Sequence, residues 1–198
     1  MVLLDFDADS LLAKRTGSSP WEVDTEVPVR LNIDGVDLLG WQHGWGREED
    51  GVPLSVIDVA WWGLVALKLA KQIGGSTLWL GMYGDRGELL FRMPETGQDV
   101  LVHSTPYRRT AQVNYDTLET AWREFAQRVR EFLMREFPAL KDQLYFSEWK
   151  EPGWQEWLAG REGTNLPVNL PMVVSVWNPD DKPEYEQVFS HLAGNETV

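Results

Sequence analysis

The stretch DTLETAWREFAQRVREFLMREFP, residues 116–138, has the pattern of an amphipathic helix. Apolar residues return along it every three or four positions, as one face of a helix requires. These residues are Leu118, Trp122, Phe125, Val129, Phe132 and Leu133. Asp116 with Glu119 resembles a capping box at the start, and Pro138 ends the helix. We expect the apolar stripe to pack on a sheet.

The forty residues before this helix, residues 76–115, have the pattern of four antiparallel strands. STLWLGMYGDRGELLFRMP (76–94) predicts strand, turn and strand. DVLVHST (99–105) and RRTAQVNY (108–115) predict a further hairpin. Because each strand follows the last after a short turn, we expect a four-stranded meander.

A second hairpin is expected in PVRLNIDGVDLLGW, residues 28–41, turning at Asp34-Gly35. A lone strand is expected in LPMVVSVWN, residues 170–178. Strands and helices are therefore segregated along the chain rather than alternating. This segregation favours an α+β fold over a doubly wound one.

The other long helix is expected in PLSVIDVAWWGLVALKLAKQIGG, residues 53–75, where apolar side chains nearly encircle the axis. Its uninterrupted apolar run, from Val59 to Leu67, is far shorter than the roughly 20 residues that span a membrane. A buried central helix is the better interpretation. The fold expected is thus a single α+β domain, residues 1–198, with an antiparallel sheet of hairpins and meander packed against two long helices, one largely buried.

The formal net charge is −13, and it is unevenly distributed. Residues 1–60 carry a net −8, residues 61–139 a net +1 and residues 140–198 a net −6. An acidic surface repels phosphates and argues against nucleic acid as a partner. It favours a basic protein partner, although surplus carboxylates can also serve solubility alone. With no cysteine and no basic region at the N-terminus, the sequence predicts a cytoplasmic protein that is not attached to a membrane.

Eleven tryptophans are present, and two acidic stretches concentrate several of them. One is GWQHGWGREEDG, residues 40–51, which follows the 28–41 hairpin, and the other covers residues 147–157. Tryptophan is enriched at binding hot spots, and carboxylates steer a basic partner. The predicted partner-binding residues are Trp41, His43, Trp45, Glu48, Glu49, Asp50, Trp149, Glu151, Trp154 and Glu156. The alternative is that these tryptophans close the ends of the core and the acids are solvated.

Two chemical alternatives use the same stretches. Glu148, Glu151 and Glu156 lie among tryptophans, which is compatible with a glycosidase-like hydrolase, whose two carboxyl groups work beside aromatic platforms. His43 with the acids that follow it has ligand types suited to zinc or manganese. Neither stretch has the spacing of a known catalytic or metal motif. No catalytic residue, metal ligand or cofactor is therefore predicted, and an enzyme is the less favoured interpretation.

The hairpin VRLNIDGVDLLGW, the strand–turn–strand LWLGMYGDRGELLFR and the helix AWREFAQRVREF together resemble bacterial immunity proteins of polymorphic toxin systems. The resemblance is to the class rather than to one family. It implies a small acidic α+β protein of the cytoplasm that masks the active site of a toxin. It implies a protein partner, such as a basic toxin domain, and no catalytic residues of its own.

Overall fold

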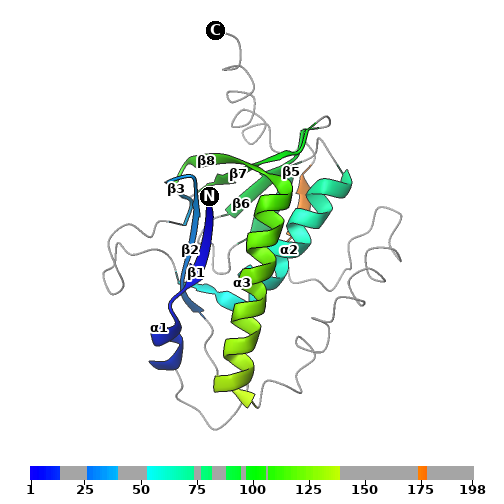
Figure 1. Ribbon diagram of the computed structural model, residues 1–198. Coiled ribbons are helices and arrows are strands. Elements are labelled where there is room, and N and C mark those ends of the chain that lie inside the picture. The colour runs from blue at the N-terminus through cyan, green and yellow to red at the C-terminus, as the bar shows by residue number, and fades with distance from the viewer. Residues whose placement is uncertain are drawn as a thin grey trace.

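The computed structural model shows an α+β fold, as the sequence predicts (Figure 1). The structure describes residues 1–13, 26–39, 53–73, 77–81, 88–94, 97–105, 107–138 and 174–177. These residues form two antiparallel sheets rather than the one expected, and both sheets contact the helices α2 (Val56–Ile73) and α3 (Tyr115–Glu136).

The first sheet is built around β2 (Glu26–Ile33), which pairs with three other strands. Its partners are β1 (Val2–Phe6), β3 (Val36–Asp37) and β4 (Pro53–Ser55), all antiparallel to it. The predicted hairpin turn is confirmed: Ile33 pairs with Val36, and the two residues between them have φ values of 48° and 88°. Positive φ at both positions matches a type I′ turn, which suits Asp-Gly.

Alternation along β2 gives the first sheet one apolar face. Val29, Leu31 and Ile33 are each at most 2 % exposed. The strand β1 was not predicted, although Leu4, Asp5 and Phe6 alternate between buried and exposed. Residues 53–55, expected within the helix 53–75, form β4 instead, because they pair with β2. After β1 comes α1 (Ala8–Ala13), a single short helix capped by Asp7, whose carboxylate accepts the backbone N–H of Ser10.

The second sheet has the strand order β8-β7-β6-β5-β9, and the predicted four-strand meander is confirmed within it. Its strands are β5 (Thr77–Gly81), β6 (Glu88–Arg92), β7 (Asp99–Ser104), β8 (Arg109–Asn114) and β9 (Val174–Trp177). The strand expected in residues 170–178 is present as β9, which pairs antiparallel with β5. That pairing joins residues about a hundred positions apart and has no local signal in the sequence.

The helix α3 (Tyr115–Glu136) buries the predicted apolar stripe in full. Its start differs from the prediction, and the capping box at Asp116 is wrong. Asn114 is the N-cap, because its side-chain oxygen accepts the backbone N–H groups of Asp116 and Thr117. The helix begins earlier because Tyr115, only 2 % exposed, belongs to its buried face.

The helix α2 (Val56–Ile73) runs antiparallel to α3, as Figure 1 shows. Most of its side chains that the structure describes are buried, including Val59, Trp62 and Val65. Trp122 of α3 donates its indole N–H to the backbone carbonyl of Val59 at 2.9 Å. The two helices are therefore joined by a specific polar contact as well as by apolar packing.

The helix α3 also joins the two sheets. Near its N-terminal end, the ring of Trp122 packs edge-on against Phe91 of β6, with centroids 5.8 Å apart. Toward its C-terminal end, Phe132 packs against Phe6 of β1 at 5.5 Å. Buried apolar residues from both sheets and both helices form one cluster. This shared core fixes the position of the first sheet relative to the second.

Candidate functional site

All ten partner-binding residues predicted from the sequence lie outside the residues that the structure describes. This holds for Trp41, His43, Trp45, Glu48, Glu49, Asp50, Trp149, Glu151, Trp154 and Glu156. Glu148, which with Glu151 and Glu156 belonged to the hydrolase alternative, lies outside as well. Their role in binding a partner stays a prediction. The structure describes residues that precede and follow the two stretches along the chain.

The described residues on either side of the stretch 40–51 contact the same strand. The backbone N–H of Leu38, just before it, donates to the carbonyl of Leu31 in β2 at 2.8 Å. Pro53, just after it, pairs with Pro28 of β2. Leu31 and Pro28 are three residues apart, which is roughly 10 Å along a strand. The described residues that flank the stretch, Leu38 and Pro53, are therefore anchored close together on one strand of the first sheet.

The chain is tightly held where it enters this stretch. Leu38 is fully buried and Leu39 is 2 % exposed. The carboxylate of Asp37, itself only 8 % exposed, accepts the backbone N–H of Leu39 at 3.1 Å. Apolar burial and a side-chain hydrogen bond thus fix the last described residues before position 40.

Arg109 connects the same place to the second sheet. Its guanidinium Nη1 donates to the backbone carbonyl of Asp37 at 2.8 Å, across 72 positions of sequence. The guanidinium also lies 5.8 Å from the ring centroid of Tyr107, in the turn between β7 and β8. An arginine held by a ring and a carbonyl loses much of its side-chain freedom, so it makes a defined contact.

The last described residues before the stretch 147–157 are those at the end of α3, and this helix packs on the first sheet. Phe137 closes this helix through its backbone N–H, which donates to the carbonyl of Leu133 at 2.8 Å, and its side chain is 5 % exposed. One turn earlier, Phe132 contacts Phe6 of β1. The chain returns to the described part at β9, in the second sheet. Among the described residues, those preceding the stretch 40–51 belong to the first sheet, and the end of α3 packs on the same sheet.

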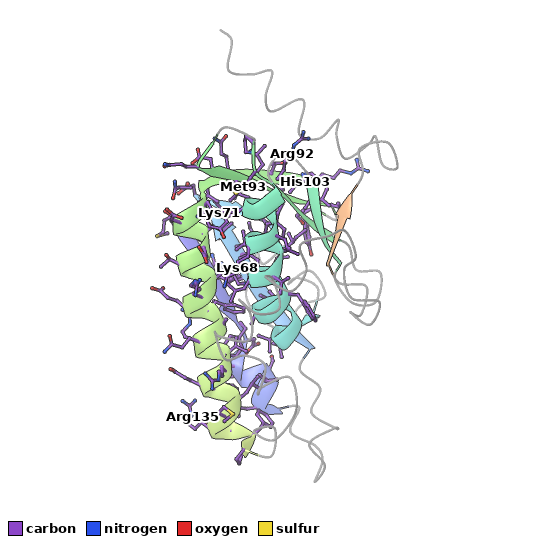
Figure 2. All side chains as sticks on the ribbon, turned by 90° about the vertical axis from the view of Figure 1, so that its right-hand side faces the viewer. Lys68, Lys71, Arg92, Met93, His103 and Arg135 are labelled. Atoms are coloured by element: carbon purple, nitrogen blue, oxygen red, sulfur yellow. The ribbon has the colours of Figure 1, made fainter. Side chains whose placement is uncertain are left out.

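Of the three histidines, the structure describes His103, which lies in β7 and is 7 % exposed (Figure 2). Its Nδ1 lies 2.7 Å from the hydroxyl of Thr110 on the paired strand β8. Burial lowers the pKa of His103 below its ordinary value of 6.5. Among the described residues, no three histidine or acidic side chains are grouped so as to hold a metal ion.

Ser104 follows His103 directly, but the two do not form a nucleophile and base. Successive side chains on a strand point to opposite faces of the sheet. Val100, Val102 and Ser104 share the inner face with Phe91, whose ring meets Trp122 of α3. His103 lies on the other face with Thr110. Within the described part of the chain, this pair therefore offers no serine catalysis.

A second polar cluster lies where α2 ends beside the start of α3. Lys71 stands over the ring of Tyr115, 4.2 Å from its centroid, and its Nζ is 3.4 Å from a carboxylate oxygen of Asp116. Burial, and secondarily the charge of Glu119, raise the pKa of Tyr115 above its ordinary value of 10.0. This cluster lies at one end of α3, and Figure 2 shows Arg135 at the opposite end of that helix from Lys71. The cluster joins two helix ends and has the character of a structural contact.

Sequence reasoning missed Arg109 and Asp37, although a signal was present for one of them. Arg109, Ala111 and Val113 occupy alternate positions of RRTAQVNY, so they share the inward face of the strand. A charged residue in a row of small apolar residues needs a partner inside the fold. Asp37 carried no such signal, because its partner lies on a strand of the other sheet.

Among the described residues, no helix has the length and apolar character needed to cross a membrane. No family model, curated protein or solved structure was found to match the chain.

Proposed function

We propose that this protein binds a basic protein partner and neutralises or regulates it, in the manner of the bacterial immunity proteins that its sequence resembles. In this proposal it acts in the cytoplasm, as an α+β domain whose antiparallel sheets pack against two long helices, one of them largely buried. The residues that contact the partner are those of the stretches 40–51 and 147–157.

One observation supports the proposal: Leu38 and Pro53, the described residues that flank the stretch 40–51, are anchored on β2 at positions three residues apart. Segments of about 6–16 residues with neighbouring ends are frequently functional surface segments. Binding residues are also commonly carried by connecting segments that a rigid scaffold positions. The buried Leu38 and Leu39 supply such rigidity at one end, and the pairing of Pro53 supplies it at the other.

The charge distribution supports a basic partner. Residues 61–139, which contain α3 and most of the second sheet, are nearly neutral at +1. The acidic surplus lies in residues 1–60 and 140–198, the parts that contain the two stretches. A local surplus of one sign raises the rate at which an oppositely charged protein associates. Tryptophans beside these acids would supply apolar contact area once the partner has arrived.

The test is an affinity capture of the tagged protein from its own cell lysate at low and high salt, read by mass spectrometry. We expect one basic protein to be retained at low salt and released at high salt, because steering by exposed charges is screened. Recovery of the tagged protein alone under both conditions would refute the proposal. A search for small ligands or an activity would then be the next step.

A further inference from the structure

We propose that Arg109 is a positioning residue for the stretch 40–51. Through the backbone of Asp37, it ties the point where this stretch begins to the second sheet. The inference that this positioning serves binding rests on the proposed function. The positioning itself rests on contacts within the described residues.

The strand that Arg109 holds is too short to be held firmly by pairing alone. The strand β3 has two residues, and it pairs with β2 through Asn32–Asp37 and Ile33–Val36. A short edge strand has few ladder hydrogen bonds, so local opening costs little free energy there. The bond from Arg109 to the carbonyl of Asp37 adds a contact from outside the sheet.

The side chain of Asp37 continues this chain of contacts toward the stretch. Its backbone carbonyl accepts from Arg109, and its carboxylate accepts from the N–H of Leu39. Displacing the backbone of Asp37 would therefore also displace Leu39, the last described residue before position 40. This arrangement couples the orientation of Arg109 to the entry of the stretch.

The orientation of Arg109 also depends on the conformation of the chain between β7 and β8. Arg108 has a φ of 49°, in the left-handed region, and Arg109 begins β8 directly after it. The guanidinium of Arg109 lies over the ring of Tyr107 in the same turn. The two hairpins, one in each sheet, therefore meet at the Arg109–Asp37 bond. Asp37, three positions before the stretch 40–51, therefore lies beside the start of β8.

The experiment compares Arg109→Met with the matched control Arg128→Met by hydrogen exchange of the free protein. Arg128 of α3 also donates from its guanidinium to a backbone carbonyl of a distant strand, that of Leu4 in β1. We expect Arg109→Met to speed exchange across residues 36–39, where the N–H groups of Leu38 and Leu39 are hydrogen-bonded, by about tenfold or more. Exchange across residues 118–129 of α3 should not change, and Arg128→Met should leave residues 36–39 as they are.

Arg109→Lys serves as the conservative variant, since an ammonium can still donate to the carbonyl of Asp37. It should restore part of the protection and remains informative if Arg109→Met folds poorly. Unchanged exchange across residues 36–39 in both variants would overturn the proposal. So would an equal acceleration in α3, because that would mean general destabilisation. These readouts need no partner, so they are independent of the capture experiment.

The link to binding is tested separately, by capture with the same variants. Accelerated exchange with weaker capture supports the full inference. Accelerated exchange with undiminished capture of a basic partner overturns the link to binding while the positioning role stands. If the wild-type protein captures nothing, the proposed function fails, and the exchange result still decides the role of Arg109.

Discussion

Gly63 of α2 lies so close to the indole ring of Trp122 in α3 that no larger residue fits between the helices. A Cβ atom at Gly63 would lie 2.1 Å from Cζ2 of Trp122, well inside van der Waals contact. In the same crossing, the indole N–H of Trp122 donates to the carbonyl of Val59, one turn before Gly63. The glycine therefore allows the helices to approach and the hydrogen bond to form.

Gly63→Ala is expected to destabilise the protein by about 1–3 kcal/mol, the usual cost of overpacking a core. Helix propensity alone predicts the opposite, because alanine is favoured over glycine inside a helix by about 1 kcal/mol. The sign of the change therefore separates the two effects. The free energy of unfolding in urea, measured for both proteins, decides between them.

Gly97→Ala is the control for this substitution, because the nearest atom to a Cβ there is 3.6 Å away. Its free energy of unfolding should stay close to that of the wild type. In a Trp122→Leu background the ring is gone, so Gly63→Ala should cost little. A stabilising Gly63→Ala in the wild-type background would show that the helices are not packed this closely.

The start of α3 gives a second prediction, one that contrasts structure with sequence pattern. Asn114→Ala should lower the free energy of unfolding by about 1 kcal/mol, because it removes the acceptor for two backbone N–H groups. Asp116→Ala should cost less, since Asp116 is exposed and its contact with Lys71 is a surface ion pair. The reverse order in thermal or urea unfolding would favour the capping box that the sequence suggests.

His103 should make stability depend on pH in the weakly acidic range. Burial lowers the pKa of His103 in the folded protein below the value of 6.5 that applies when the chain is unfolded. The folded state therefore binds the proton less readily than the unfolded state. The contribution of His103 to the free energy of unfolding is lost as the pH falls below 6.5 toward the folded pKa. Above 6.5 the imidazole is neutral in both states, and this contribution is fully present.

The carboxylates of an acidic protein also titrate at low pH, so the effect of His103 is read as a difference. The free energies of unfolding of the wild type and His103→Gln are compared at about pH 7.5 and about pH 5.5. The wild type should lose more stability than the variant between these pH values. Equal losses would mean that the pKa of His103 is the same in the folded and unfolded states.

Local patterns predicted the parts of the fold that local interactions determine. The stripe from Leu118 to Leu133 is buried because 3.6-residue periodicity places it on one face, and Asp34-Gly35 turns because both residues adopt positive φ. The pairings of β1, β4 and β9 could not be predicted, since tertiary contacts select a register between distant segments. The close approach at Gly63 likewise depends on a partner in another helix.

The candidate site was predictable only in composition. Tryptophans and acids near positions 41–50 mark a stretch with binding potential, but sequence contains nothing about where its ends lie. The structure places the flanking residues Pro53 and Leu38 beside β2, where they contact Pro28 and Leu31. The partner of Arg109 could not be predicted, because it is a backbone carbonyl, which every residue carries.

The central claim is that the acids of the stretch 40–51 recruit a basic partner. The most direct test repeats the affinity capture with Glu48, Glu49 and Asp50 all changed to lysine. The control changes Asp5, Asp9 and Glu124, three exposed acids outside both stretches, to lysine. Each triple change shifts the formal net charge from −13 to −7, so the two variants differ only in where the charge is altered.

At low salt, the account predicts that the variant of the stretch 40–51 captures the basic partner about tenfold more slowly than the wild type. The control variant should capture it at nearly the wild-type rate, and both variants should unfold in urea close to the wild type. Equal capture by the two variants would contradict the claim. It would mean that overall charge, or another surface, recruits the partner.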